Sequence, residues 1–289
     1  MSEESGSLGR AFGAAVPAVR RLRGERDALA AENARLQAQV AQLEQRVERQ
    51  RVHKRDLRRR YDEAAGLLHS HSFDESALSY LFVATYGRSG STLLQGILNS
   101  IPGYLVRGEN SGALLKLHAF HQELASAAER NGPAVATTNS WYGIGRYKRE
   151  TATALLRNLM LAGLLTPAPD TRVVGFKEIR WWTEEWRSLT DFVLEVFPGA
   201  RFLINLRDHE SVMKSKWWAE MEPQAARATL LDHEAQLSAM ADHLGERAFT
   251  VRYDEYVGDP DALRPMFEWL GEPFDRAAID AVLATPHSY

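Results

Sequence analysis

One stretch of the chain decides its fold: Tyr80-Leu-Phe-Val-Ala-Thr85-Tyr-Gly-Arg88-Ser-Gly-Ser-Thr92-Leu-Leu-Gln-Gly-Ile-Leu98. It begins as an apolar, strand-like run, passes through a short turn rich in glycine and hydroxyl groups, and continues with helix-compatible residues. Backbone N–H groups in such a strand-to-helix turn face a common concavity, and the helix N-terminus adds partial positive charge. Arg88 inside the turn supplies further donors for phosphate or sulfate oxygens. This stretch therefore predicts an anion site whose ligand is a nucleotide.

The turn differs from the phosphate loop of ATP- and GTP-binding proteins, whose pattern is G-x-x-x-x-G-K-[ST]. Gly87 and Gly90 are too close together, and Ser91 stands where the lysine belongs. The pattern resembles instead the 5′-phosphosulfate loop of sulfotransferases that use 3′-phosphoadenosine 5′-phosphosulfate (PAPS), in particular carbohydrate sulfotransferases, including bacterial ones. The resemblance implies a set of donor-binding residues: Tyr86, Gly87, Arg88, Ser89, Gly90, Ser91 and Thr92. An ordinary turn with capping serines is the alternative.

A second motif strengthens the resemblance. The apolar run Phe202-Leu-Ile-Asn-Leu206 ends in Arg207-Asp208, and Ser215 follows Arg207 by eight residues. In the sulfotransferase family, an arginine at the end of such a strand and a serine at this spacing on the next helix bind the 3′-phosphate of the donor. The resemblance implies these roles for Arg207 and Ser215. A guanidinium can clamp a phosphate through two charge-assisted hydrogen bonds, and a hydroxyl adds one donor. Taken alone, Arg207-Asp208 is more typical of a surface ion pair.

Four strand-like runs alternate with helix-compatible segments beyond residue 70. They cover residues 79–85, 172–179, 201–206 and 248–253. This alternation predicts an α/β fold, a P-loop-like three-layer domain with a mostly parallel central sheet covered by helices. Ligands of such sheets bind at the carboxyl ends of the strands, where both the turn and Arg207 fall. We therefore expect the two motifs to converge on one ligand.

The strand-like run at residues 172–179 ends within a charged and aromatic segment, Lys177-Glu178-Ile179-Arg180-Trp181-Trp182. A similar Lys-Glu-Ile-Arg run occurs in related bacterial sulfotransferases, whereas cytosolic relatives carry Lys-Thr-His with a catalytic histidine. Ile179 stands where that histidine would fall, so the base is expected elsewhere. A structural ion network of Lys177, Glu178 and Arg180 is the alternative.

Sulfuryl transfer resembles phosphoryl transfer in needing in-line geometry and cations around the migrating group. Arg88 and Lys177 are therefore predicted to stabilise charge on the sulfuryl oxygens and the leaving phosphate, and no metal is required. Glu109 is predicted as the base, because its Gly-Glu motif resembles the acidic acceptor-site element of bacterial carbohydrate sulfotransferases. Glu178 is the second choice.

A histidine is the third possibility for the base. His118 or His121 would qualify if the helix that follows Ser111 faces the cleft. The resemblance as a whole covers about residues 79–275 in separated blocks. It lacks the C-terminal Arg-Lys-Gly element that cytosolic small-molecule sulfotransferases fold over the donor, since the chain ends Ala284-Thr-Pro-His-Ser-Tyr289.

The resemblance implies an enzyme that moves the sulfuryl group of PAPS to a hydroxyl of a carbohydrate or glycolipid acceptor. Two alternatives from other classes remain. One is a nucleotide-binding small-molecule kinase, which the missing lysine of the phosphate loop argues against. The other is a coiled-coil adaptor with an inactive sulfotransferase-like domain, against which the intact pattern of Arg88, Ser91, Arg207 and Ser215 speaks.

The first 70 residues carry a different pattern. Leucines recur at seven-residue spacing with valine or asparagine between them, at Val19, Leu22, Leu29, Asn33, Leu36, Val40, Leu43, Val47 and Leu57. This heptad repeat predicts a coiled coil, although Arg26, Gln50 and Lys54 interrupt it. A single asparagine between leucine layers favours a parallel two-stranded coil. We expect a dimerising helix over residues 1–70 and a catalytic domain over residues 71–289, in a parallel homodimer. A lone amphipathic helix lying on the globular domain is the alternative.

Charge is divided unevenly between these two parts. Residues 1–70 hold 14 Lys+Arg and 10 Asp+Glu (+4), and the rest hold 21 and 28 (−7), which sums to −3. The positive excess lies between Arg51 and Arg60, a run that suits an anionic membrane surface or a solvated coil end. It has no nucleic-acid motif, so no nucleic acid is expected. The absence of cysteine, of a bilayer-spanning apolar run and of a signal-like start favours a cytoplasmic protein.

Overall fold

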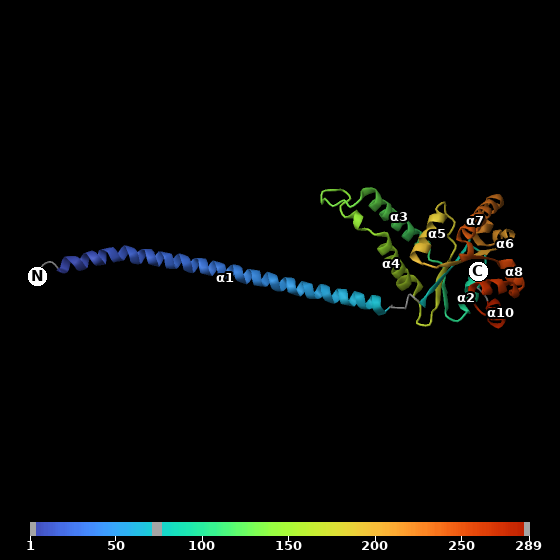
Figure 1. Cartoon of the computed structure of the whole chain (residues 1–289), viewed down its shortest axis with the longest axis horizontal. Helices are drawn as coiled ribbons and strands as arrows, with labels where there is room; N and C mark the ends of the chain where they lie inside the picture. The colour runs from blue at the N-terminus through green and yellow to red at the C-terminus, as the bar shows by residue number, and fades with distance from the viewer. Residues whose placement is uncertain (1–3, 71–76, 286–289) are drawn as a thin grey trace. The chain divides into compact units, whose positions relative to one another are not determined.

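The computed structural model describes residues 4–70 and 77–285, and the chain divides into two compact units after Ser70. The first unit is a single helix of 67 residues, α1 (Glu4–Ser70) (Figure 1). Alanine, leucine, arginine, glutamine and glutamate dominate it, and these residues have the highest helix propensities. In the described part of the chain, no helix has the length and apolar character needed to cross a membrane.

The second unit is built on five strands, all paired in parallel in the order β2-β3-β1-β4-β5. Their bounds are β1 (Ser79–Thr85), β2 (Tyr104–Arg107), β3 (Val173–Glu178), β4 (Arg201–Leu206) and β5 (Ala248–Arg252). The predicted α/β fold with a parallel central sheet is therefore confirmed. The strand that the sequence did not indicate is β2, because four residues are too few to establish a period.

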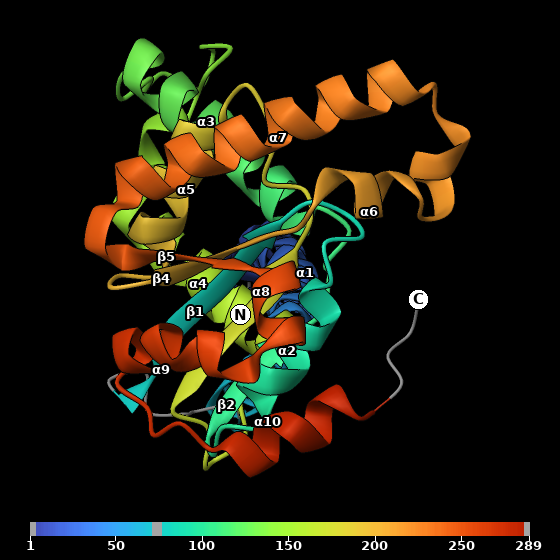
Figure 2. The same ribbon diagram turned by 90° about the vertical axis from the view of Figure 1, so that its right-hand side faces the viewer.

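Helices cover both faces of the sheet (Figure 2). One face carries α2 (Ser91–Asn99), α8 (Tyr253–Gly258), α9 (Arg264–Leu270) and α10 (Arg276–Leu283). The other face carries α3 (Ala113–Asn131), α4 (Arg149–Met160), α5 (Trp186–Val196) and α7 (Pro223–Leu244). The remaining short helices are α6 (His209–Met213), η2 (Ile144–Arg146), η3 (Leu161–Leu165), η4 (Lys216–Glu220), η5 (Gly245–Arg247) and η6 (Pro260–Leu263).

The strands are apolar on both sides because each face packs against helices. Phe82 of β1 belongs to the core under α5 and α7, whereas its neighbours Leu81 and Val83 belong to the core under α2 and α9. Successive side chains of a strand point to opposite faces, so a doubly covered strand reads as a continuous apolar run. This explains why β1 and β4 were predicted with their correct bounds.

The order of the strands brings the sequence motifs together. β1 lies between β3 and β4, with Thr85 beside Asn205 and Val83 beside Lys177. The carboxyl ends of the three strands therefore meet at one edge of the sheet. The turn after β1, Lys177 of β3 and Arg207 after β4 all start from that edge.

The segment after β4 differs from the continuous helix expected there. Helix α6 ends at Met213, Ser215 has an extended backbone (φ −114°, ψ 124°), and Lys216, the first residue of η4, has a positive φ of 47°. Ser215 is thus held in a turn between two short helices. The spacing of Ser215 from Arg207 is as expected, but the direction of the Ser215 side chain is set by this break between the two helices.

Candidate active site

The turn between β1 and α2 is packed so tightly that it needs glycine at two positions. Gly90 precedes α2 in the left-handed conformation (φ 78°), and a Cβ atom there would lie 2.0 Å from the ring of Tyr253. A Cβ atom on Gly87 would lie 2.4 Å from the ring of Trp217. The aromatic side chains therefore approach the backbone of the turn directly, as only glycine allows.

The two predicted anion-binding motifs contact each other. Arg207 donates from Nη1 to the backbone oxygen of Arg88 at 3.1 Å, and Arg88 donates from Nε to Oγ of Ser215 at 2.7 Å. The guanidinium of Arg207 also lies over the ring of Tyr253, 4.3 Å from its centroid. The turn and the segment after β4 therefore form one site.

A cavity of about 720 Å³ opens at this edge of the sheet. Its lining comes from the turn, from β3 and the residues that follow β2, β3 and β4, and from α8 and the end of α10. The lining residues used below are Gly87, Arg88, Gly90, Ser91, Thr92, Glu109, Lys177, Arg207, Lys216, Trp217 and Tyr253. Most of the residues predicted from the sequence are therefore gathered around one space.

The charge of the lining suits an anion with several phosphate groups. Among the described lining residues, the basic side chains of Arg88, Lys177, Arg207 and Lys216 share the cavity with one carboxylate, that of Glu109. Nε of Arg207 is buried, and none of the described residues accepts a hydrogen bond from it. A buried donor of this kind is costly unless a ligand pairs with it. The residues present therefore fit a nucleotide such as PAPS, with a phosphate at Arg207.

Three of the residues predicted to bind the donor do not line the cavity: Tyr86, Ser89 and Ser215. Tyr86 is fully buried; its hydroxyl donates to the backbone oxygen of Arg207 at 2.8 Å and accepts from the Arg207 N–H at 2.9 Å. Burial raises the pKa of Tyr86 to about 12. Tyr86 therefore positions Arg207 and leaves the ligand contact to others.

Ser89 belongs to a buried polar network beneath the turn. Its Oγ lies 2.6 Å from Oγ1 of Thr85, and its backbone oxygen accepts from the side-chain amide of Asn205 at 2.9 Å. Tyr256 donates to Oδ1 of the same asparagine at 3.1 Å. Asn205 thus ties the turn to β4 and α8. Its polar side chain within the apolar run 202–206 was the sequence signal for this role.

Glu109 and Lys177 form an ion pair at the cavity wall. Nζ of Lys177 lies 2.7 Å from Oε1 of Glu109, and Nη1 of Arg180 lies 3.9 Å from Oε2. The lysine side chain is 7% exposed, whereas the glutamate side chain is 37% exposed. Glu109 can therefore reach a molecule in the cavity, and Lys177 contacts both that carboxylate and the cavity.

Glu178 has surroundings that differ from those expected of a base. Its side chain is 3% exposed and does not line the cavity. Oε2 accepts from the backbone N–H groups of Asn110 and Gly112, at 3.1 and 3.2 Å. Oε1 accepts from the N–H of Ile179 at 2.8 Å and from Nη1 of Arg180 at 3.1 Å. With both oxygens occupied, Glu178 holds the loop that carries Glu109.

The two histidines considered as bases face away from the cavity. Nε2 of His118 lies 2.9 Å from Oγ of Ser188 on α5. Nδ1 of His121 lies 2.8 Å from the hydroxyl of Tyr147, and its ring packs against Phe192. Burial lowers the pKa of both histidines. The buried face of α3 is directed at α5 instead of the cleft, so this alternative was wrong.

Lys216 and Tyr253 are among the cavity residues that had no assigned role in the sequence analysis, whereas the pair Trp217-Trp218 was expected to form core or groove wall or to stack on adenine through one member. Lys216 was detectable only as a basic residue next to Ser215. Trp217 is 45% exposed, whereas Trp218 is 5% exposed and donates from its indole nitrogen to the Gly87 oxygen at 3.1 Å. Of this pair, only Trp217 is therefore available to a ligand.

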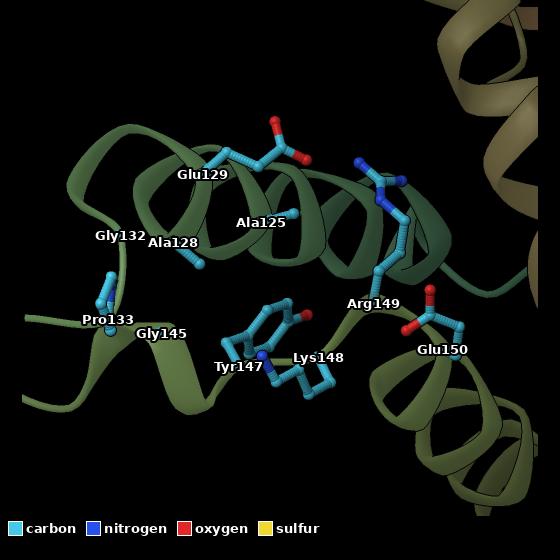
Figure 3. A pocket seen from close by; sticks show the side chains of 10 residues that line it. All are labelled: Ala125, Ala128, Glu129, Gly132, Pro133, Gly145, Tyr147, Lys148, Arg149 and Glu150. Carbon is cyan, nitrogen blue, oxygen red and sulfur yellow. The ribbon is translucent and has the colours of Figure 1, made fainter.

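A second cavity of about 380 Å³ lies away from this site (Figure 3). It is formed between the C-terminal half of α3 and the segment from Gly145 to Glu150, with the ring of Tyr147 directed into it. It shares no residue with the first cavity. Its lining combines two basic and two acidic side chains and indicates no particular ligand.

Comparison with known proteins assigns the family. A family model described as the sulfotransferase family matches residues 81–276. The chain is similar to the sulfotransferase domain of the olefin synthase from Synechococcus PCC 7002, at 19% identity over 73% of this chain and 78% of that chain, with a TM-score of 0.47. It is also similar to sulfotransferase STF9 from Mycobacterium avium, at 15% identity over 78% of this chain and 70% of that chain, with a TM-score of 0.43. No curated protein matches the chain.

The matched region begins in β1 and ends at the first residue of α10, so it includes the turn, Glu109, Lys177, Arg207 and Ser215. It covers more than half of the chain. The resemblance found in the sequence is thereby confirmed, and the chain belongs to the family of PAPS-dependent sulfotransferases.

Proposed function

We propose that this protein transfers the sulfuryl group of PAPS to a hydroxyl group of a carbohydrate or glycolipid. The observation that carries the proposal is the cavity in which Arg88, Lys177 and Arg207 meet the carboxylate of Glu109. The three cations suit the phosphates and sulfate of the donor. The carboxylate suits a hydroxyl acceptor, which must lose a proton as it reacts.

Bound PAPS would supply an activated sulfuryl group with adenosine 3′,5′-bisphosphate as its leaving group. Arg207 and Ser215 would bind the 3′-phosphate, and Arg207 is held for this by Tyr86. The N–H groups of the turn from Gly87 to Thr92 would bind the 5′ end at the N-terminus of α2. Holding both ends of the nucleotide fixes the direction in which the sulfuryl group leaves.

Glu109 would take the proton of the acceptor hydroxyl as its oxygen forms the new bond to sulfur. The bond between sulfur and the phosphate oxygen would break on the opposite side, so negative charge would develop on the leaving nucleotide. Arg88 and Lys177 would stabilise that charge. Because Lys177 also contacts Glu109 at 2.7 Å, it would hold the carboxylate beside the reacting group.

The carbohydrate acceptor is supported by the sequence resemblance and by an exposed aromatic side chain on the segment that follows β3. Trp182 follows β3 and is 44% exposed. One face of its indole stacks on His233, with ring centroids 4.4 Å apart and planes inclined by 18°. The outward face of such a ring is an apolar platform of the kind that ligand sites use together with a few polar groups.

The test is transfer of label from ³⁵S-PAPS to a panel of oligosaccharides and glycolipids, with Glu109→Gln as the main variant. We expect label in a saccharide product, and a fall in turnover of about 10²- to 10⁴-fold in the variant, the range for loss of a general base. Binding of adenosine 3′,5′-bisphosphate should persist, because Glu109 is an anion and contributes no donor to phosphate.

Glu129→Gln is the matched control, since Glu129 lines the second cavity and should leave turnover unchanged. Retention of turnover in Glu109→Gln would refute the assignment of the base. Transfer only to non-carbohydrate hydroxyls would refute the acceptor class. Failure of the wild-type chain to bind the bisphosphate would refute the proposal as a whole.

A further inference from the structure

The exposed face of α1 is the largest feature that the proposed chemistry does not use. Six apolar side chains at the core positions of the heptad repeat are between 48% (Val47) and 71% (Leu29) exposed. They are Leu22, Leu29, Leu36, Val40, Leu43 and Val47. They recur every seven residues from Leu22 to Leu36 and every three or four residues from Leu36 to Val47, which forms one apolar stripe along the helix. Helices gain most of their stability by packing such a stripe, so this face requires a partner.

We propose that the partner is α1 of a second copy of this chain, parallel and in register. The stripe has valine at the a positions Val40 and Val47 and leucine at the d positions from Leu22 to Leu43. β-branched residues at a with leucine at d favour two parallel strands over three or four. The same stripe on two identical helices is self-complementary, because each core position then packs against the same position of the partner helix.

Asn33 determines the orientation. In a parallel pair it faces Asn33 of the partner subunit, and the two amides can hydrogen-bond to each other. In an antiparallel pair, each a position faces a d position, so Asn33 would be buried against an apolar side chain. A buried amide without a partner is costly. The asparagine therefore selects the parallel pair in a single register.

The basic residues beside the stripe have acidic partners in their own helix. Arg26, at an a position, donates to Asp27 from Nε at 3.0 Å and from Nη2 at 2.6 Å. Glu48 lies 3.8 Å from Arg51 and 3.1 Å from Arg55. These pairs reduce the repulsion between like charges that a parallel alignment brings close together. The interruption of the heptad repeat at Arg26 is thus compatible with a second copy.

The first test is the mass of the whole chain in solution at micromolar concentration, by sedimentation or light scattering. We expect twice the 32.5 kDa of one chain. A monomer would overturn the proposal. Leu36→Glu, which places a charge in the middle of the stripe, should convert the dimer to the monomer, whereas Ala38→Glu on the outer face should not.

The second test uses the absence of cysteine from the chain. Leu29→Cys places one thiol at a d position, where it faces its equivalent in a parallel pair. Ala31→Cys is the matched control, because its f position points away from the partner. Under mild oxidation we expect Leu29→Cys to form the cross-linked dimer at least about tenfold faster than Ala31→Cys.

A dimeric mass together with equal cross-linking of the two variants would overturn the parallel arrangement, since an antiparallel pair separates the two copies of residue 29. Asn33→Leu gives an independent check. It should raise the melting temperature of the helical segment and produce species heavier than a dimer, because the buried asparagine restricts association at a cost in stability. A lower melting temperature with an unchanged mass would contradict the role of Asn33.

Discussion

Nε of Arg88 lies 2.7 Å from Oγ of Ser215, although 127 residues separate them in the chain. This hydrogen bond joins the turn after β1 to the break between α6 and η4. Two motifs that each resemble one half of a nucleotide site are therefore coupled through their own side chains. A substitution at one end of the ligand should therefore also change binding at the other end.

We predict that Arg88→Ala and Ser215→Ala each weaken binding of adenosine 3′,5′-bisphosphate, and that their effects are not additive. Each removes a donor to phosphate and also the bond between the two residues, so the double variant loses that bond only once. The coupling should be about 0.5–3 kcal/mol, the usual range for residues in contact. Calorimetry on the four proteins measures it. Arg149→Ala with Ser215→Ala, whose sites do not contact, should be additive.

Gly90→Ala should abolish the tight contact between the turn and Tyr253. The new methyl group would lie 2.0 Å from the ring, and the positive φ of 78° adds about 1–2 kcal/mol of strain for any residue with a Cβ. Displacing Tyr253 also removes the ring beneath Arg207. We expect bisphosphate affinity to fall at least about tenfold. Gly163→Ala, which meets nothing within 4 Å, is the control, and equal affinities would contradict this account.

Glu178→Gln should destabilise the catalytic unit more than it slows the chemistry. An amide nitrogen in place of one oxygen would face N–H groups and leave donors unpaired, at about 1–3 kcal/mol. The melting temperature should fall by roughly 2–4 °C per kcal/mol for a unit of this size. Thermal unfolding followed by circular dichroism measures this. An unchanged melting temperature with lost turnover would instead make Glu178 the base.

Stability should decrease in mildly acidic solution because of the buried histidines. Burial lowers the pKa of His118, His121 and His233 below the ordinary value of 6.5. The unfolded chain therefore takes up protons at a higher pH than the folded chain does, and stability is lost as the pH falls below 6.5. Melting temperatures between pH 7.5 and 5.5 should show this fall. His121→Phe should make the dependence shallower by up to about 1.4 kcal/mol per pH unit, and an unchanged slope would contradict it.

Trp182→Ala should raise the KM for the saccharide and leave donor binding unchanged. Loss of an aromatic stacking contact worth about 0.5–1.5 kcal/mol corresponds to roughly a two- to tenfold change. Trp141→Ala is the control, because Trp141 is similarly exposed (47%) but lies on the loop that follows α3. Steady-state kinetics with both substrates measures the two KM values. A change confined to the KM for PAPS would contradict a role of Trp182 in saccharide binding.

Local sequence patterns were sufficient to predict the elements and motifs near the sheet. β1 and β4 were predicted with their correct bounds because strands covered on both faces are continuously apolar. Arg88 and Arg207 were identified because the motifs around them are local. The four-residue β2 and the break at Lys216 were not, since neither leaves a periodic signal.

The direction in which a side chain points could not be predicted for several site residues. Tyr86, Ser89 and Glu178 were grouped with the ligand-binding or catalytic residues because they lie beside them in the chain. All three are buried and make hydrogen bonds within the protein. The side chains of neighbouring residues in a turn or strand point alternately toward the ligand and toward the core. Which of them faces the ligand depends on packing against distant elements.

Residue spacing along a few tens of positions was enough to establish the α/β class, the family and the heptad repeat of α1. The tertiary structure decided which residues meet: the order β3-β1-β4 brings Lys177, the turn and Arg207 to one edge. It also decided that Glu109 is the carboxylate facing the cavity and that Glu178 is enclosed. Such pairings join residues about 70 to 130 positions apart, and only the packed sheet determines which of them are neighbours.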